Sequence, residues 1–255
     1  MSQKTFRILL FAIIILFPLC SQASEASFQP GEKLKFLLRW NIIPAGEAVL
    51  MVQPMDEING EPVFHFVMTA ESNSFLDLFY KVRDRVESFT DIGMTHSVLY
   101  KNHQREGGTR RNIVVDFDWV NSKVQYSRDG QKKAPVTLVS GAFDPLGIFY
   151  YLRGLDLDKM SSVERPVSDG TKCVIGRGNI VKRQTIRVPA GTFHTLLIEP
   201  DLKDVGGVFE KSKDAKIRIW VTADERHIPV KIQSKVVVGS FVGELVKVQL
   251  PEPSP

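Results

Sequence analysis

This sequence has few of the residues that build covalent or metal-bound frameworks. Only two of its 255 residues are cysteines, Cys20 and Cys173. The five histidines lack the close His and Cys spacing that metal sites usually display. No Gly-x-Ser-x-Gly elbow marks a serine nucleophile. The sequence therefore predicts no metal, no cofactor and no catalytic residue, and a fold that depends on its hydrophobic core.

A long hydrophobic run occurs only near the N-terminus, and it is too short for a stable transmembrane anchor. Lys4 and Arg7 precede an apolar run over residues 8–19, and small and polar residues follow it. This order is typical of a secretory signal peptide with cleavage after Ala23. We predict a signal peptide over residues 1–23 and a periplasmic protein. The alternative is a membrane-anchored lipoprotein lipidated at Cys20.

Charge is nearly balanced once the predicted signal peptide is removed. The whole chain has a formal charge of +4, and residues 1–23 contain two basic residues and no acidic one. The remaining 31 basic and 29 acidic residues give a formal charge of +2. This balance favours neither a nucleic acid nor an anionic membrane as partner. The remaining cysteine, Cys173, cannot form an internal disulfide.

Residues 24–255 are dominated by short β patterns, which are apolar or alternate apolar with polar residues and end at turn residues. The predicted strands cover residues 33–40, 47–52, 63–70, 81–89, 96–104, 109–116, 123–128, 170–175, 181–188, 191–200, 216–222, 229–238 and 243–250. We predict a single, mainly β domain of about a dozen antiparallel strands in a strongly curved sheet, half-barrel or barrel. Gly46, Gly191 and the Gly176-Arg177-Gly178 stretch are interpreted as turn residues.

One or two short helices interrupt the strands. The clearest is predicted over residues 144–154, with Asp144 as cap, Pro145 at the start and Gly154 at the exit. A second, shorter helix is indicated after Ser72 or Asn73.

Both helical segments carry large apolar side chains, and these are the candidate ligand-binding residues. They are Phe75, Leu78, Phe79, Phe143, Phe149 and Tyr150. Such residues pack in the core or line an apolar groove, and general burial preferences favour packing for both segments. A basic cluster around Gly107-Gly108 is interpreted as a solvated hairpin tip whose charge is matched by nearby acids. Its members are Arg105, Arg110 and Arg111, matched by Glu106, Asp116 and Asp118.

Several stretches, in order along almost the whole of residues 24–255, point to one family. They are Gly31-Glu32-Lys33-Leu34, Ala45-Gly46-Glu47-Ala48, Phe79-Tyr80-Lys81-Val82-Arg83-Asp84, Phe143-Asp144-Pro145-Leu146, Tyr150-Tyr151-Leu152-Arg153, Pro189-Ala190-Gly191-Thr192-Phe193, Ile219-Trp220-Val221-Thr222 and Arg226-His227-Ile228-Pro229-Val230. Together they resemble the bacterial domain-of-unknown-function family 3108. The resemblance implies an exported envelope protein with an antiparallel β fold, similar to the half-barrels of periplasmic lipoprotein carriers, which hold acyl chains.

Two functions follow from these features. The first is a non-enzymatic envelope protein that binds an apolar ligand or a partner protein in the concave face of the sheet. Its partner would be a lipid, a lipoprotein acyl chain or another envelope protein, and the mature protein would have no transmembrane span. The alternative is an envelope hydrolase whose site is assembled from distant residues, for which Asp84, Arg153 and His194 are the nominees.

Overall fold

The computed structural model describes residues 27–201, 215–236 and 239–251. The predicted signal peptide and Cys20 lie outside the described residues. Within them, sixteen strands form one sheet, accompanied by two short α-helices and one 3-10 helix. The prediction of a mainly β fold with one or two short helices is therefore confirmed.

The elements follow one another as a series of hairpins. The strands are β1 (Lys33–Trp40), β2 (Ile43–Val52), β3 (Asp56–Ile58), β4 (Glu61–Ser72), β5 (Arg83–Asp91), β6 (Ser97–Glu106), β7 (Thr109–Asp118), β8 (Lys123–Arg128), β9 (Gln131–Lys132), β10 (Val136–Thr137), β11 (Ser162–Ser168), β12 (Cys173–Val188), β13 (Gly191–Pro200), β14 (Lys216–Thr222), β15 (Pro229–Val236) and β16 (Gly239–Gln249). The helices are α1 (Ser74–Asp77), α2 (Gly147–Arg153) and the 3-10 helix η1 (Leu157–Lys159).

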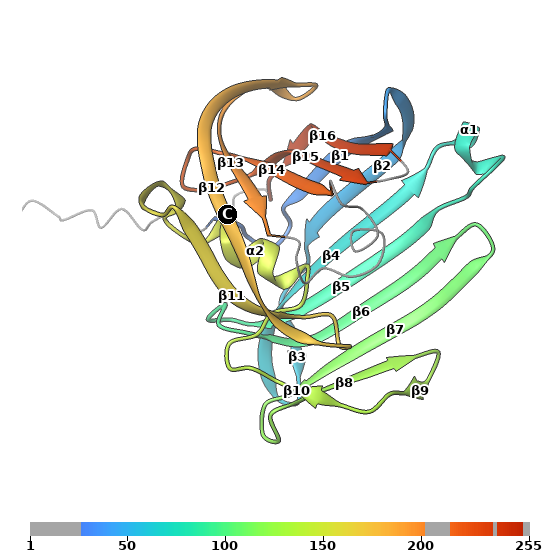
Figure 1. Cartoon of the computed structure of the whole chain (residues 1–255), viewed down its shortest axis with the longest axis vertical. Coiled ribbons are helices and arrows are strands. Elements are labelled where there is room, and N and C mark those ends of the chain that lie inside the picture. Colours follow the sequence, from blue (N-terminus) through green and yellow to red (C-terminus); the bar gives the residue numbers. More distant parts are fainter. Residues whose placement is uncertain (1–26, 202–214, 237–238, 252–255) are drawn as a thin grey trace, which may run out of the picture.

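The sheet is antiparallel, and its strand order is β10-β8-β7-β6-β5-β4-β2-β1-β16-β15-β14-β13-β12-β11. Two short strands lie off this path, since β3 pairs with β4 and β9 with β8. The sheet curves strongly, and α2 lies within the curve (Figure 1). Because neighbouring strands are joined by hairpins, the connections β1–β2, β4–β5 and β6–β7 gather at one end of the sheet. The β7–β8 turn lies at the opposite end.

The main core forms where α2 meets the curved sheet. Tyr150 is fully buried and stacks on Phe66 of β4, with 3.9 Å between ring centroids. Phe28, before β1, makes edge contacts with both rings. The same cluster contains Leu146, directly before α2, and Leu245 from β16. One helix therefore buries apolar surface contributed by strands from both halves of the chain, which is the dominant favourable term in folding.

The α2 prediction is correct in type and close in its bounds. The helix begins at Gly147 instead of Asp144. Asp144 nevertheless caps it, because its carboxylate accepts hydrogen bonds from the N–H groups of Leu146 and Gly147 at 2.8 and 2.9 Å. Pro145 lies in the turn before the helix.

The prediction of a turn at Gly176-Arg177-Gly178 is wrong. These residues lie inside β12, one sixteen-residue strand where two strands were expected. A Cβ at Gly176 would lie 3.2 Å from Val167, and one at Gly178 would lie 3.4 Å from Ile198. The two glycines therefore allow close packing along a strand and do not turn the chain.

Gly46 also lies inside a strand, because β2 begins at Ile43 and not after the predicted turn. Gly46 pairs with Ser72 of β4, and a Cβ at Gly46 would overlap the carbonyl oxygen of Glu71. By contrast, Gly191 does open a strand after a turn, with φ of +142°. The close approach of β2 to β4 thus requires a residue without a side chain at position 46.

We expect Gly46→Val to lower the free energy of unfolding by about 1–3 kcal/mol, because the new side chain must push β2 away from β4. Urea denaturation measures the change. Gly108→Val is the matched control, since nothing lies within 4 Å of a Cβ there. Equal losses in the two variants would contradict the close-approach explanation.

Candidate functional site

The six candidate ligand-binding residues lie in two separate places. Phe143, Phe149 and Tyr150 belong to the α2 region inside the curved sheet. Phe75, Leu78 and Phe79 belong to α1 and the chain that follows it, at the end of the sheet. The structure does not bring them together into one groove.

The α2 residues are core residues, as the burial argument favoured. Phe143 and Tyr150 have no exposed surface, and Phe149 is half-buried against the same cluster. The cavity beside α2, lined by Phe149, Leu157 and Ile198 among others, has a volume of about 10 Å³. Pockets for small molecules usually measure roughly 300–1,000 Å³. This cavity is too small for an acyl chain.

A buried ion pair fixes the end of α2. Arg153 and Glu32 are 2% and 1% exposed, and two guanidinium nitrogens of Arg153 donate to the two carboxylate oxygens of Glu32 at 2.6 and 3.1 Å. Arg153 also donates to the carbonyl oxygen of Ser27, and Arg226 donates to Glu32. Because several hydrogen bonds satisfy both charges, their burial is tolerated. The pair joins α2 to the segment that leads into β1.

Asp144 forms a second buried polar cluster at the other end of α2. Its Oδ2 atom accepts hydrogen bonds from the hydroxyl groups of Ser88 on β5 and Ser97 on β6, both at 2.6 Å. The pKa of the Asp144 carboxyl is raised, because the effect of burial exceeds that of these bonds and of the bonds from the backbone N–H groups, which lower it. Four donors occupy the carboxylate, so it holds α2 against the sheet and has no free oxygen for chemistry.

The other candidate residues form an exposed apolar surface, which we call the apolar rim. It consists of Ile42, Ile43, Phe75, Leu78, Phe79 and Tyr80. Ile42 is 89% exposed, Leu78 78% and Phe79 74%. The expectation that the 75–80 segment packs inward is therefore wrong. The strand β4 ends at Ser72, and α1, which buries none of its residues, lies beyond the ends of the strands.

Two parts of the chain meet in the apolar rim. Asn73 N–H donates to the carbonyl oxygen of Ala45 at 2.9 Å, and the Asn73 side-chain amide donates to that of Pro44 at 2.7 Å. These bonds attach α1 to the start of β2, beside Ile42 and Ile43. The rings of Phe75 and Phe79 are in edge contact, with 5.7 Å between their centroids, and the exposed side chains of Ile42 and Ile43 belong to the neighbouring segment. Exposed apolar side chains gathered in one region mark a binding surface more often than chance.

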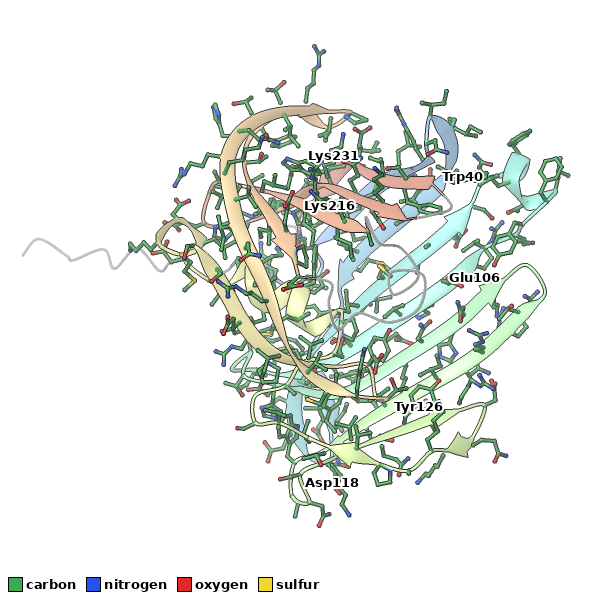
Figure 2. The ribbon with its side chains drawn as sticks, viewed as in Figure 1. Trp40, Glu106, Asp118, Tyr126, Lys216 and Lys231 are labelled. Atoms are coloured by element: carbon green, nitrogen blue, oxygen red, sulfur yellow. The ribbon has the colours of Figure 1, made fainter. Side chains whose placement is uncertain are left out.

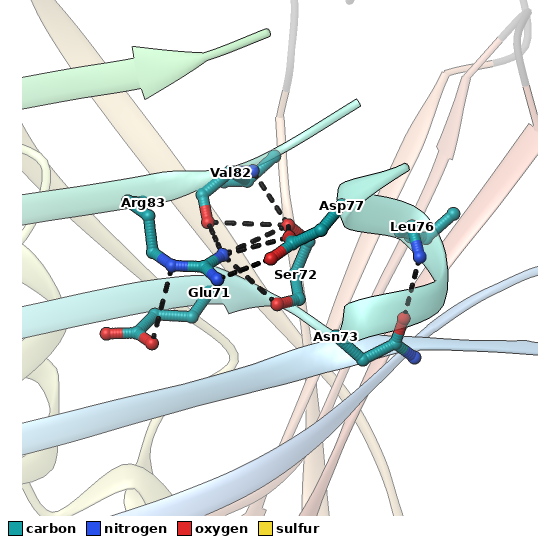
Figure 3. A network of polar contacts seen from close by, with 7 residues as sticks. All are labelled: Glu71, Ser72, Asn73, Leu76, Asp77, Val82 and Arg83. Carbon is teal, nitrogen blue, oxygen red and sulfur yellow. Dashed lines mark hydrogen bonds and ion pairs between the residues drawn. The ribbon is translucent and has the colours of Figure 1, made fainter. Parts of the chain in front are cut away.

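A polar network holds α1 in place under the apolar rim (Figure 3). Arg83 donates to both carboxylate oxygens of Asp77, at 3.1 and 2.6 Å, and Ser72 donates to Asp77 at 2.5 Å. These two partners, Arg83 first, lower the pKa of Asp77. Asn73 caps the helix by accepting the N–H of Leu76 at 2.9 Å. The exposed side chains are therefore presented by a fixed backbone.

A hollow of about 340 Å³ lies next to α1 on β2 and β4. Its lining includes Val49 and Thr69 and the carboxylates of Glu47 and Glu71. Lys35 pairs with Glu47 at 2.8 Å, and Arg83 lies 3.7 Å from Glu71. The two carboxylates make this hollow unfavourable for an anionic headgroup.

The β6–β7 hairpin adjoins the apolar rim on its other side. Gly107 N–H donates to the carbonyl oxygen of Lys81, and the Tyr80 hydroxyl donates to Glu106 at 3.4 Å. Asp84 accepts the N–H of Arg105 at 2.7 Å. Burial, helped by the neighbouring Glu106 and opposed by that N–H, raises the pKa of Asp84 to about 6. The basic tip of the hairpin thus lies next to two interacting carboxyl groups, Glu106 of the hairpin and Asp84 of β5.

The sequence as a whole matches a family. The family described as "Protein of unknown function (DUF3108)" matches residues 35–246. The chain belongs to this family. The resemblance found in the sequence motifs is thereby confirmed. No curated protein matches the chain.

A solved structure of another domain-of-unknown-function family shares the fold of this DUF3108 protein, and further structures match it with TM-scores below 0.5. A beta-barrel-like protein of domain of unknown function DUF1849 from Brucella abortus has a TM-score of 0.54 at 12% identity, over 89% of this chain and 100% of that chain. A protein from Bacteroides fragilis, described provisionally as exported with a YmcC-like fold, has a TM-score of 0.31 at 9% identity, over 87% and 97% of the two chains. A protein from Parabacteroides distasonis, described provisionally as a lipoprotein, has a TM-score of 0.33 at 9% identity, over 88% and 98%.

The nominees for a hydrolase site in this DUF3108 protein do not meet. Asp84 is on β5 beside the β6–β7 hairpin, Arg153 is buried at the end of α2, and His194 is exposed on β13 beside Thr185. In the described parts of the chain, no group of three or more His, Cys, Asp or Glu side chains is placed to hold a metal ion. No helix of the described residues is long and apolar enough to cross a membrane.

We expect Arg153→Met to lower the free energy of unfolding by about 3–5 kcal/mol, because it leaves the Glu32 carboxylate buried without its main partner. Chemical denaturation followed by tryptophan fluorescence measures the change. Lys159→Met is the control, because Lys159 is 83% exposed and pairs with Asp156 on the surface. Such a pair contributes at most about 1 kcal/mol. A loss for Arg153→Met as small as for the control would contradict the anchoring role.

Asp84→Asn should stabilise the protein at neutral pH. The pKa of Asp84 is raised in the fold from 3.8 to about 6. The contribution of Asp84 to the free energy of unfolding is therefore fully present below about pH 4 and is lost as the pH rises through about 6. An asparagine side chain cannot ionise, and it keeps an oxygen that can accept the backbone N–H of Arg105. We expect the variant to gain about 1 kcal/mol over wild type between about pH 4 and pH 7.5, a value discounted for solvent screening.

Thermal denaturation across this pH range measures the difference. Asp116→Asn, an exposed position on β7, controls for the loss of one negative charge. A difference between Asp84→Asn and wild type that does not change with pH would contradict the raised pKa.

Proposed function

We propose that this protein is an exported, non-enzymatic binding protein of the cell envelope, and that the apolar rim holds its apolar partner. The signal-like segment over residues 1–23 supports export. The partner is a lipid or the apolar surface of another envelope protein. The position of the rim differs from the concave site expected from the sequence, and the cavity beside α2 has a volume of only about 10 Å³.

One observation carries the proposal. The rim exposes Phe75, Leu78 and Phe79 together on a four-residue helix and the residues directly after it, and the Arg83–Asp77 network holds that helix in place. Exposing these side chains does not stabilise the fold, because burial in the core would contribute roughly 1.5–3 kcal/mol for each. A partner that covers them would recover that free energy. Their fixed backbone also reduces the entropy that binding would cost.

Binding of a fluorescent fatty acid tests the proposal. We expect the wild-type protein to bind it, and the double variant Leu78→Ser/Phe79→Ser to bind at least tenfold more weakly, because two apolar contacts are lost. Val120→Ser is the matched control, since Val120 is 94% exposed at the opposite end of the sheet. Equal binding by all three proteins would overturn the proposal.

Stability measurements on the same variants separate binding from folding. Because Leu78 and Phe79 are 78% and 74% exposed, the double variant should unfold within about 1 kcal/mol of wild type. A large loss of stability would mean that these side chains are core residues, contrary to their exposure.

A further inference from the structure

We propose that the apolar rim and the neighbouring β6–β7 hairpin dock on a lipid bilayer whose headgroups are anionic. This inference rests on the proposed function and names the partner. It combines the exposed apolar side chains of the β4–β5 connection with a group of exposed cations. The β4–β5 and β6–β7 connections lie side by side at one end of the sheet (Figure 1).

The cations are Lys81, Arg105, Arg110 and Arg111, all exposed. Among the described residues, none of them has a carboxylate within ion-pair distance. Arg110 donates only to the carbonyl oxygens of Gly107 and Thr109, and Arg111 donates to the Gln104 side chain. Their charges are therefore available to an anionic surface.

The pairing of the hairpin places two of these cations opposite each other. Arg105 pairs directly with Arg110 across β6 and β7. Like charges in this position destabilise a hairpin. An external anion that binds between them would relieve this repulsion, which favours an anionic partner over a neutral one.

The acids that balance these cations in the sequence do not balance them in the structure. Asp118 and Asp116 lie toward the far end of β7, and each residue of a strand advances the chain by about 3.3 Å. Asp118 there accepts hydrogen bonds from Asn121. Figure 2 shows Glu106 and Asp118 at separate ends of the same strand pair. The interpretation that nearby acids match the hairpin charge is therefore wrong for Asp116 and Asp118.

The carboxylates that do remain near the rim are engaged. Asp77 is paired with Arg83 at 2.6 Å, and Glu106 interacts with Asp84 and Tyr80. Glu47 and Glu71, which line the hollow beside α1, are paired with Lys35 and Arg83. The cations of the β6–β7 hairpin therefore stay available to an anionic surface, although residues 24–255 carry a formal charge of only +2.

The shape of this region suits a bilayer. The connections β1–β2, β4–β5 and β6–β7 succeed one another along an outward edge, and α1 projects from it (Figure 1). Phe75, Phe79 and the amphipathic ring of Tyr80 can enter the headgroup region, where aromatic side chains are favoured. The arginines and Lys81 would lie at the level of the anionic groups. A bilayer supplies the apolar and the anionic component at adjoining depths.

Vesicle sedimentation tests this docking. The full chain, expressed with its own residues 1–23, is mixed with vesicles of phosphatidylcholine alone or with about one third phosphatidylglycerol. We expect binding to the anionic vesicles and little to the neutral ones. Raising the salt to about 1 M, where the Debye length is about 3 Å, should weaken it.

Two variants separate the two components. Arg105→Gln/Arg110→Gln should weaken binding to the anionic vesicles by about 30-fold, at about 1 kcal/mol for each charge near the surface. Leu78→Ser/Phe79→Ser should weaken it at least tenfold. Lys123→Gln/Val120→Ser, at the other end of the sheet, is the control and should bind as wild type.

The outcomes distinguish this inference from the proposed function. Rim-dependent binding of the fatty acid without binding to anionic vesicles would overturn the inference alone. Vesicle binding that the arginine variant leaves unchanged would also overturn the inference alone. The same holds if the vesicles stay unbound while the protein self-associates or captures an acidic partner protein, and the rim variants abolish that association. Rim variants that change neither fatty acid nor vesicle binding would overturn both proposals. Loss of vesicle binding in both variants, with the control unchanged, would support both.

Discussion

The attachment of α2 within the curved sheet is the constraint on which the rest of this structure depends. The Glu32–Arg153 pair holds one end of the helix, and Asp144, bound to Ser88 and Ser97, holds the other. Between these polar ends, Tyr150 stacks on Phe66 in the main core. The two polar clusters fix the position of the helix, while the apolar contacts supply most of the favourable free energy. The cavity that remains beside α2 is too small for an acyl chain.

The described residues therefore divide the large apolar side chains between the core and an exposed surface. Large apolar side chains inside the sheet are buried, whereas those of the apolar rim lie on a short helix beyond the strands. Arg83 and Asp77 hold that helix through polar contacts that do not need the rim side chains. Changes at the rim are consequently possible at little cost to the fold, a division that is common in β proteins whose loops bind partners.

The strand pattern of this chain was predictable because period-two alternation and turn residues are local signals. The bounds of β1, β8, β13 and β14 agree with those expected from the sequence. Errors arose because glycine occurs both in turns and where strands pack closely. Gly176 and Gly178 are of the second kind, inside β12. The short strands β3, β9 and β10, and the longer β11, gave no clear alternation.

The candidate site was less predictable, since it depends on contacts between distant residues. The Phe75, Leu78 and Phe79 segment was recognised as unusual, but composition alone does not say whether a short apolar helix faces the core or the solvent. Glu32 and Arg153 are 121 positions apart, and no local pattern reveals their pairing. Asp116 and Asp118 are near Arg110 in sequence but remote from it in space, because an extended strand separates them. The balance of charges along the sequence therefore predicted the wrong balance of charges around the β6–β7 hairpin.

The pairing of β1 with β16 has a consequence for how the chain folds. Asn41, just after β1, is hydrogen bonded to Ser240 in β16, 199 positions later. The inner strand β1 can thus pair with β2 early in folding, but with its other neighbour, β16, only after almost the entire sheet has formed. Until β16 arrives, one edge of β1 exposes unpaired backbone groups and the apolar side chains of Leu34 and Phe36. Such an edge invites pairing with other chains. Completing the sheet is a slow, long-range step, and the incomplete sheet must be shielded from aggregation until β16 has paired with β1.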